Sequence, residues 1–267
     1  MHKYFNNKVV WITGASSGIG EALAYAMSTA GAKLILSSRR IDELERVKQA
    51  CSAPGLVHVL PLDLSDTNSL EAKVQEAINC FGSIDVMVHN GGITQRSLVI
   101  DTEIEVHRRL MELDYFSYVV LTKALLPHFI GRKAGHFVVT SSVMGKIGTP
   151  MRSAYAAAKH ALHGFFDCLR AEVAADNIKV TILTPGYIRT NISLYAATNK
   201  PYGLGKPSEN IENGLPAGQA AKQIMKAIKR AAFEAYIGKL SGERIGLWLN
   251  RFLPGVLTRI APKLVPK

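Results

Sequence analysis

The sequence predicts an α/β chain with a doubly wound parallel sheet flanked by helices. Six short runs rich in Val, Ile and Leu alternate with amphipathic segments of helical periodicity. Near-continuous apolar runs are typical of strands buried on both faces, and their alternation with helices is typical of a parallel sheet. The length of 267 residues favours a single domain over residues 1–267.

The predicted elements follow one another in a regular order. Strands are expected at 8–13, 33–37, 57–62, 84–89, 136–140 and 179–183. Helices are expected at 20–30, 42–51, 69–80, 102–130, 153–176 and 217–232. Pro127 is expected to end the fourth of these helices, because proline has no N–H to donate to the preceding turn.

Residues 187–216 break the alternation. Prolines and glycines gather there among polar residues, and they are Pro201, Gly203, Gly205, Pro207, Gly214 and Pro216. The segment is too long for a plain connector, and long loops in compact domains are often active-site lids. We therefore expect a substrate lid over residues 187–216.

The last segment, residues 241–267, predicts a basic amphipathic tail. Its apolar residues recur at helical spacing and are Ile245, Trp248, Leu249, Phe252, Leu253, Val256, Leu257 and Ile260. Arg244, Arg251 and Arg259 stand beside them, and Pro254 interrupts the pattern. Three interpretations stay open: a contact with a subunit or the lid, in which the tail packs against its own domain or a sister chain, a helix on a membrane surface, and a dock for an acidic carrier.

The net charge of the chain is +11, and much of it lies toward the C-terminus. Residues 218–267 hold ten lysines and arginines against two glutamates, a net charge of +8. A basic surface attracts phosphorylated cofactors, acidic partners, acidic lipids or nucleic acid. No nucleic-acid-binding motif accompanies the charge, and only 7% of the residues are aromatic, so nucleic acid is the weakest of these partners.

The composition also indicates in which cellular compartment the protein is expected. No apolar run reaches the length of about eighteen residues that a membrane span needs. Residues 1–7 are polar and lack an apolar signal region, so export is not expected. Cys51, Cys80 and Cys168 are scattered, which predicts reduced thiols rather than a disulfide framework or a metal site. We expect a cytoplasmic protein without a metal, whose tail in one interpretation lies at a membrane.

A glycine-rich loop joins the first predicted strand to the first predicted helix. It reads Thr13-Gly-Ala-Ser-Ser-Gly-Ile-Gly20, with the spacing G-x-x-x-G-x-G. Glycines let the backbone turn tightly and approach a pyrophosphate, and the helix N-terminus adds free N–H groups. In this strand–turn–helix context the loop predicts a Rossmann-like, dinucleotide-binding fold.

The end of the second predicted strand indicates which dinucleotide binds. An NAD-preferring sheet carries an acidic residue there to hold the ribose 2′-hydroxyl. This chain has Ser37-Ser38-Arg39-Arg40 instead. An arginine fork suits a phosphate because it donates two parallel hydrogen bonds, so we expect NADP(H).

Tyr155 and Lys159 form the predicted chemical centre. They are four residues apart in a helical pattern and therefore lie on one face, one turn apart. A nearby ammonium favours the phenolate form of a tyrosine, so the pair can protonate a nascent alkoxide or deprotonate an alcohol. Ser142 follows the fifth strand, where a parallel sheet presents ligand groups, and could hold a substrate carbonyl.

Together these motifs resemble the short-chain dehydrogenase/reductase family. The matching motifs are TGASSGIG at 13–20, Asp63-Leu64, Asn90-Gly91-Gly92, Ser141-Ser142, Tyr155-Ala-Ala-Ala-Lys159 and Pro185-Gly186. The resemblance covers Val9 to Thr190, about two-thirds of the chain. Residues 152–160, 164–172 and 185–191 are similar to the branch called dehydrogenase/reductase member seven, especially its 7B type.

The resemblance implies a role for each matched position. The cofactor phosphates would contact Gly14, Ser16, Ser17 and Ile19, and the 2′-phosphate would contact Arg39. The adenine would contact Asp63 and Leu64, and the ribose next to it would contact Asn90 and Gly91. The nicotinamide and its ribose would meet Tyr155, Lys159, Pro185, Gly186, Ile188 and Thr190. Ser142 and Tyr155 would face the substrate.

One position departs from the family's pattern. The family usually has an asparagine in the long central helix, where it positions a water behind the lysine, and here alignment on Met111 to Phe116 places Asp114 there. An ionised aspartate accepts but cannot donate, and its negative charge opposes ionisation of Tyr155. Three interpretations stay open: a working variant with a shifted pH optimum, a slow enzyme, or a lapsed one. The first is favoured, because a carboxylate can also relay protons.

The predicted function is an NADPH-dependent carbonyl reductase, or alcohol dehydrogenase in reverse, acting on an apolar ketone or secondary alcohol. Residues 92–99, 143–152 and the lid are expected to shape its pocket. One alternative is a 3-oxoacyl-carrier reductase, and a non-enzymatic one is an NADPH-binding sensor or membrane-surface module. The resemblance further implies a homodimer or homotetramer.

Overall fold

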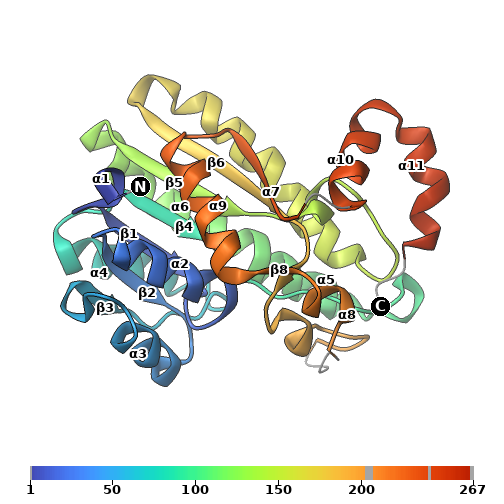
Figure 1. Ribbon diagram of the computed structural model, residues 1–267, viewed down its shortest axis with the longest axis horizontal. Helices are drawn as coiled ribbons and strands as arrows, with labels where there is room; N and C mark the ends of the chain where they lie inside the picture. Colours follow the sequence, from blue (N-terminus) through green and yellow to red (C-terminus); the bar gives the residue numbers. More distant parts are fainter. Residues whose placement is uncertain (1, 202–206, 240–241, 265–267) are drawn as a thin grey trace.

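The computed structural model describes residues 2–201, 207–239 and 242–264. Within them lies a seven-stranded parallel sheet with the order β3-β2-β1-β4-β5-β6-β9 (Figure 1). The strands are β1 (Val9–Thr13), β2 (Lys33–Ser37), β3 (Val57–Val59), β4 (Val86–His89), β5 (Gly135–Thr140), β6 (Ile178–Pro185) and β9 (Glu234–Ile237). The prediction of a doubly wound parallel sheet is confirmed, with β9 as a strand that the sequence analysis did not predict.

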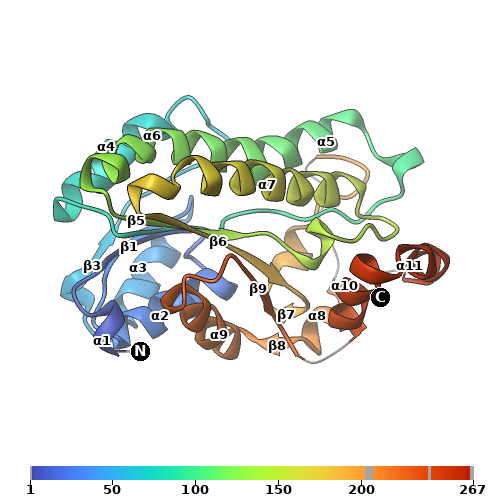
Figure 2. The same cartoon turned by 90° about the horizontal axis from the view of Figure 1, so that it is seen from above.

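Two helix layers cover the two faces of this sheet (Figure 2). One layer contains α4 (Leu70–Phe81), α5 (Ile104–Met111), α6 (Ser117–Arg132) and α7 (Ser153–Glu172). The other contains α2 (Gly18–Thr29), α3 (Ile41–Gln49) and α9 (Ala217–Lys229), with the short α1 (His2–Phe5) beside it. Successive strand residues point to opposite faces, so Trp11 packs toward the first layer while Val10 and Ile12 pack toward the second.

Short elements connect the main ones. They are η1 (Pro54–Leu56), η2 (Val99–Asp101), η4 (Val143–Gly145), η5 (Ala174–Asp176), β7 (Ile188–Arg189), η6 (Ile192–Tyr195), α8 (Glu209–Glu212) and β8 (Leu215–Pro216). β7 and β8 pair in parallel and lie in the predicted lid. Residues 202–206 of that segment lie outside the described residues.

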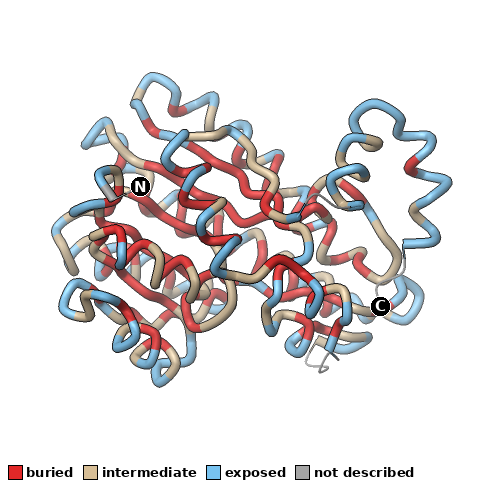
Figure 3. The backbone as a smooth tube through the Cα atoms, in the orientation of Figure 1, coloured by how far each residue is buried: buried red, intermediate tan, exposed pale blue. Residues whose placement is uncertain are grey.

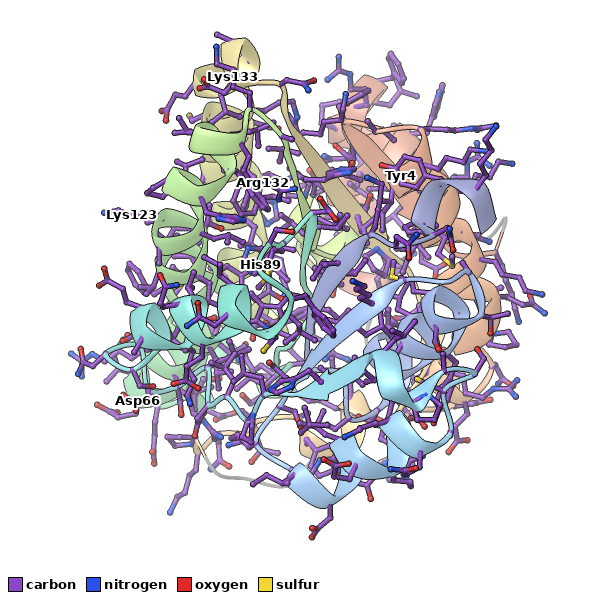
Figure 4. All side chains as sticks on the ribbon, turned by 90° about the vertical axis from the view of Figure 1, so that its left-hand side faces the viewer. Tyr4, Asp66, His89, Lys123, Arg132 and Lys133 are labelled. Atoms are coloured by element: carbon purple, nitrogen blue, oxygen red, sulfur yellow. The ribbon has the colours of Figure 1, made fainter. Side chains whose placement is uncertain are left out.

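The long central helix differs from its prediction in two ways. A π-helical turn, η3 (Glu112–Phe116), joins α5 to α6. Pro127 does not end the helix, because Leu125 and Phe129 beside it are fully buried and their packing outweighs one lost hydrogen bond. The helix continues to Arg132, which donates to Asp85 Oδ1 (2.8 Å) on the side of the molecule shown in Figure 4.

The predicted tail contains two helices that stand apart from the two layers. We call α10 (Gly242–Phe252), α11 (Pro254–Ile260) and the turn η7 (Ala261–Lys263) the C-terminal arm. Figure 3 shows that most of the arm is exposed, in contrast to the buried strands. Residue 241 and residues 265–267 of the tail lie outside the described residues. None of the described helices is both long and apolar enough to cross a bilayer.

Candidate active site

The predicted site residues meet in one cleft at the carboxyl end of the sheet. Strand order reverses between β1 and β4, and ligands of open α/β sheets bind at such a point. The cleft there has a volume of about 380 Å³. It is lined by every residue assigned a role in the sequence analysis: Gly14, Ser16, Ser17, Ile19, Arg39, Asp63, Leu64, Asn90, Gly91, Asp114, Ser142, Tyr155, Lys159, Pro185, Gly186, Ile188 and Thr190.

The glycine loop forms the floor of the cleft. Gly14 has a φ of +64°, a conformation that favours glycine, and a Cβ there would lie 2.6 Å from the Cα of Gly91. A Cβ on Gly91 would in turn lie 2.6 Å from Leu64 Cδ1. The glycine loop and the turn after β4 can therefore approach this closely only because neither glycine carries a side chain.

Hydrogen bonds fix the loop against β4. Thr13 Oγ1 accepts from the backbone N–H groups of Asn90 (3.0 Å) and Gly91 (3.2 Å). The Asn90 side-chain amide donates to Thr13 O (3.2 Å). On the other side the Tyr118 hydroxyl donates to Gly91 O (2.9 Å). The turn after β4 is thus held from both sides, so it offers a rigid wall to a ribose.

Two arginines follow β2 at one end of the cleft. Arg40 Nη2 donates to Ser16 Oγ (3.1 Å) and Ser17 Oγ (3.2 Å), so its guanidinium lies over the glycine loop. Arg39 lines the cleft and is exposed. The sequence analysis assigned the 2′-phosphate to Arg39, and in the structure both Arg39 and Arg40 line the cleft.

Lys159 is buried beneath the catalytic tyrosine candidate. Its ammonium donates to Thr140 O (3.2 Å) and lies 3.2 Å from Asp114 Oδ2. The same nitrogen is 5.7 Å from the ring centroid of Tyr155. The exposed fraction of Lys159 is 4% and that of Asp114 is 0%, so the two charges face each other away from bulk water.

Asp114 occupies the middle of the π-helical turn. Such turns are frequent at functional sites, and this one aims the carboxylate at the turn after β4. The backbone N–H of Ile93 donates to Asp114 Oδ1 (2.9 Å). Gly92 leaves space for the carboxylate, because a Cβ on Gly92 would lie 2.9 Å from the same oxygen.

Burial and neighbouring charges shift the pKa values of both Asp114 and Lys159. Burial raises the pKa of Asp114, while the Lys159 ammonium and the Ile93 N–H oppose that rise. For Lys159, burial favours the neutral amine, but the negative charge of Asp114 outweighs burial and raises the pKa of Lys159 above the ordinary value. The pair therefore keeps Lys159 as an ammonium near neutral pH.

Ser142 caps the turn after β5. Its Oγ accepts from the backbone N–H of Met144 (3.1 Å), which leaves its own hydroxyl proton for a ligand. The preceding Ser141 contacts Lys159 O (3.2 Å) and His163 Nε2 (3.0 Å). Burial lowers the pKa of His163 to about 4, so this histidine is neutral near neutral pH and acts through its contact with Ser141.

These geometric features agree with the comparisons. The family model for short chain dehydrogenases matches residues 8–200. The chain belongs to the short-chain dehydrogenase/reductase family. It is an oxidoreductase family, and the resemblance stated from the motifs is therefore confirmed.

Named relatives place the chain near one branch of the family. It is 45% identical over 271 aligned positions to a dehydrogenase/reductase SDR family protein 7-like of Anopheles gambiae, which covers 99% of this chain and 85% of the relative. It is 40% identical to dehydrogenase/reductase SDR family member 7B of Mus musculus, over 96% of this chain and 81% of the relative.

Two solved structures share the fold. A short-chain dehydrogenase from Streptomyces avermitilis superposes with a TM-score of 0.80 at 32% identity, covering 96% of both chains. A short-chain dehydrogenase/reductase from Burkholderia phymatum, solved in complex with NAD, has a TM-score of 0.83 at 22% identity and covers 96% of this chain and 95% of its own. The second likeness concerns the fold alone.

Two further residues line the cleft, and the sequence analysis gave neither of them a role of its own. Arg152 is buried and donates to Thr94 Oγ1 (2.6 Å) and Gln95 O (2.7 Å). Glu243 comes from the arm, and its Oε1 accepts from the backbone N–H of Tyr187 (3.0 Å). Arg152 stands next to the Tyr155 motif, which is a usable signal, whereas nothing near Glu243 in the sequence indicates a cleft residue. Across the described ranges, no three His, Cys, Asp or Glu side chains gather as metal ligands.

Proposed function

We propose that this chain is an NADPH-dependent carbonyl reductase that acts on an apolar ketone or, in reverse, on a secondary alcohol. The observation that carries the proposal is the meeting of Tyr155, Lys159 and Ser142 with the glycine loop in one cleft. An acid–base group and a nucleotide cradle in the same cavity suit hydride transfer with coupled proton transfer.

The cleft supports a nicotinamide dinucleotide as the partner in this reaction. When bound, the nicotinamide supplies or accepts the hydride. The glycine loop would hold its phosphates, and residues 185–190 would line its ring. Arg39 and Arg40 favour NADP(H), because two guanidiniums and no carboxylate follow β2. The preference for the 2′-phosphorylated form therefore rests on these two arginines.

The chain's own residues account for the proton. Tyr155 gives its hydroxyl proton to the ketone oxygen as the carbonyl carbon gains a hydride, so that a secondary alcohol forms. Ser142 donates a hydrogen bond to the same oxygen and stabilises the charge that develops on it. Lys159 stabilises the resulting phenolate, and Asp114 holds Lys159 in its charged form. This ion pair supports a working enzyme rather than a lapsed one.

An apolar substrate fits the side chains beyond the cofactor region. The apolar side chains that line the cleft include Ile93, Val143, Met144, Ile192 and Ile211. These come from segments that the sequence analysis assigned to the pocket and the lid. Three expectations stay predictions. They are that residues 187–216 act as a lid, that the protein assembles into a dimer or tetramer, and that it is cytoplasmic.

Turnover of a ketone panel with NADPH and NADH tests the proposal. In Tyr155→Phe, we expect reduction to slow by about 10²–10⁴ with NADPH binding retained. Tyr4→Phe, far from the cleft (labelled in Figure 4), is the matched control and should leave the rate unchanged. Wild-type protein that binds NADPH but reduces no ketone would favour the sensor, and activity confined to carrier-linked 3-oxoacyl groups would favour the carrier reductase.

The cofactor preference has its own test. Removing one charged hydrogen-bonding partner of a phosphate costs at least about tenfold in affinity. Arg39→Ala should therefore weaken NADPH binding by that factor and leave NADH binding unchanged. Arg40→Ala also removes the contacts with Ser16 and Ser17, so it should weaken the binding of both cofactors. Wild-type protein that binds NADH more tightly than NADPH would overturn this part of the proposal.

A further inference from the structure

The C-terminal arm exposes an apolar ridge. The ridge consists of Ile245, Trp248, Phe252, Leu253, Val256, Ile260 and Leu264. Phe252 and Ile245 are each 62% exposed and Trp248 is 53% exposed, although large apolar side chains are usually buried. Trp248 and Phe252 contact each other with ring centroids 5.5 Å apart, so they form one continuous apolar surface.

Positive charges border this ridge. Arg244, Arg251, Arg259 and Lys263 are exposed, and none of them pairs with a carboxylate among the described residues. The one acidic side chain of the arm is Glu243, and it faces the cleft, where it accepts from Tyr187. The exposed side of the arm therefore combines apolar and cationic groups with no anionic ones.

This combination selects among possible partners. A second copy of the chain, docked ridge to ridge, would bring the same cations against each other. An anionic bilayer accommodates both features, because apolar side chains enter the acyl boundary while arginines meet lipid phosphates. Tryptophan also favours the membrane–water interface. We propose that the C-terminal arm docks the protein on the surface of anionic lipid bilayers.

The opposite face of the arm borders the candidate active site. Leu257 of α11 and Leu247 and Leu249 of α10 pack with Val143 and Ile147, which follow β5. A bilayer bound to the ridge would therefore lie close to the cleft. Figures 1 and 2 place the η2 loop at the same end of the molecule, and Ile100 within it is 91% exposed. As a consequence that rests on the proposed function, an apolar ketone dissolved in the bilayer would have a short path to Ser142 and Tyr155.

The two tryptophans allow a direct test. Trp11 is fully buried, so a change in emission on binding reports Trp248. The full chain is mixed with vesicles of phosphatidylcholine alone or with added phosphatidylserine. We expect a blue shift of emission and co-sedimentation with the anionic vesicles only, both weakening as salt is added. Because no substrate is present, this result does not depend on turnover.

Matched variants locate the contact. Each cation near an anionic surface is worth about fivefold in partitioning, so Arg251→Glu should weaken vesicle binding by at least about fivefold, and Phe252→Glu should weaken it further. Phe233→Glu is the control, since Phe233 is 70% exposed but precedes β9 at the end away from the arm.

Three results would overturn the proposal. The first is that the wild-type protein does not bind anionic vesicles at low salt. The second is equal loss of binding in Phe233→Glu and Phe252→Glu. The third is self-association abolished by Phe252→Glu in sedimentation velocity without vesicle binding, which would assign the ridge to a second copy. Ketone reduction is measured in a separate assay without vesicles, so failure of the docking proposal can be told apart from failure of the proposed function.

Discussion

The cleft and the arm bury their residues to very different degrees. In the cleft, the two charged residues behind Tyr155 are shielded from water, and glycines meet with no space for a Cβ. In the arm, α10 has no buried residue and α11 has only Leu257. Close packing leaves little freedom for substitution, whereas an exposed surface tolerates it. Substitutions in the cleft should therefore change stability and catalysis, and those on the ridge should change neither.

The largest effect is expected where the cleft holds a buried ion pair. Asp114→Ala would leave the Lys159 ammonium without its carboxylate, and breaking a buried pair in this way costs about 3–5 kcal/mol. Trp248→Ala on the ridge should change the free energy of unfolding by less than about 0.5 kcal/mol. Urea unfolding of both variants measures the contrast. Equal losses in the two variants would contradict the division into a packed cleft and a tolerant arm.

The pH dependence of turnover sharpens the role of the same pair. The carboxylate is lost as the pH falls through the raised pKa of Asp114, and the ammonium is lost as the pH rises through the raised pKa of Lys159. Asp114→Asn removes the negative charge and the titrating group, so the acid limb of the rate profile should be lost and the alkaline limb should move to lower pH. On the acid limb of the wild type we expect a fall of about tenfold per pH unit. An unchanged profile would remove Asp114 from the proton chemistry.

The same contrast explains which features the sequence could predict. Strands β1, β2, β4, β5 and β6 were predicted because each is an apolar run whose residues are mostly buried. The edge strand β3 was predicted over residues 57–62 but spans only Val57–Val59. β9 (Glu234–Ile237) was missed because it lies at the sheet edge, is only partly buried and contains a glutamate. Pro127 was expected to end a helix from local rules alone, yet the burial of its neighbours on the helix overrides that local cost.

The candidate site was predicted where a motif is local and missed where it is assembled from distant segments. The glycine loop and the Tyr155–Lys159 pair are each contiguous in the chain, so spacing alone locates them. Asp114 was placed by alignment, but its π-helical turn and its contact with Ile93 depend on tertiary packing. Glu243 has no local signal, because its partner Tyr187 lies 56 residues away in the chain.

A smaller effect is expected from the glycine loop. Gly14→Ala would force a side chain into a left-handed backbone conformation beside Gly91, at a cost of about 1–2 kcal/mol before any clash. NADPH binding should weaken in parallel. Gly164→Ala is the matched control, since Gly164 lies on the exposed side of α7 with no atom near a new Cβ, and it should stabilise the protein by about 0.5–1 kcal/mol. Thermal unfolding and NADPH titration of both variants would show whether the cradle needs its glycines.

The smallest effect is expected at Glu243, where the arm meets the cleft. Its carboxylate accepts from the Tyr187 N–H at the start of the lid segment. Glu243→Gln keeps an acceptor but replaces a charged hydrogen bond with a neutral one, which weakens the contact by about 1 kcal/mol. Hydrogen exchange of the Tyr187 amide should accelerate about fivefold, while vesicle binding through the ridge stays unchanged. If vesicle binding also falls, the arm depends on this contact for its position, and the cleft and the arm act as one unit.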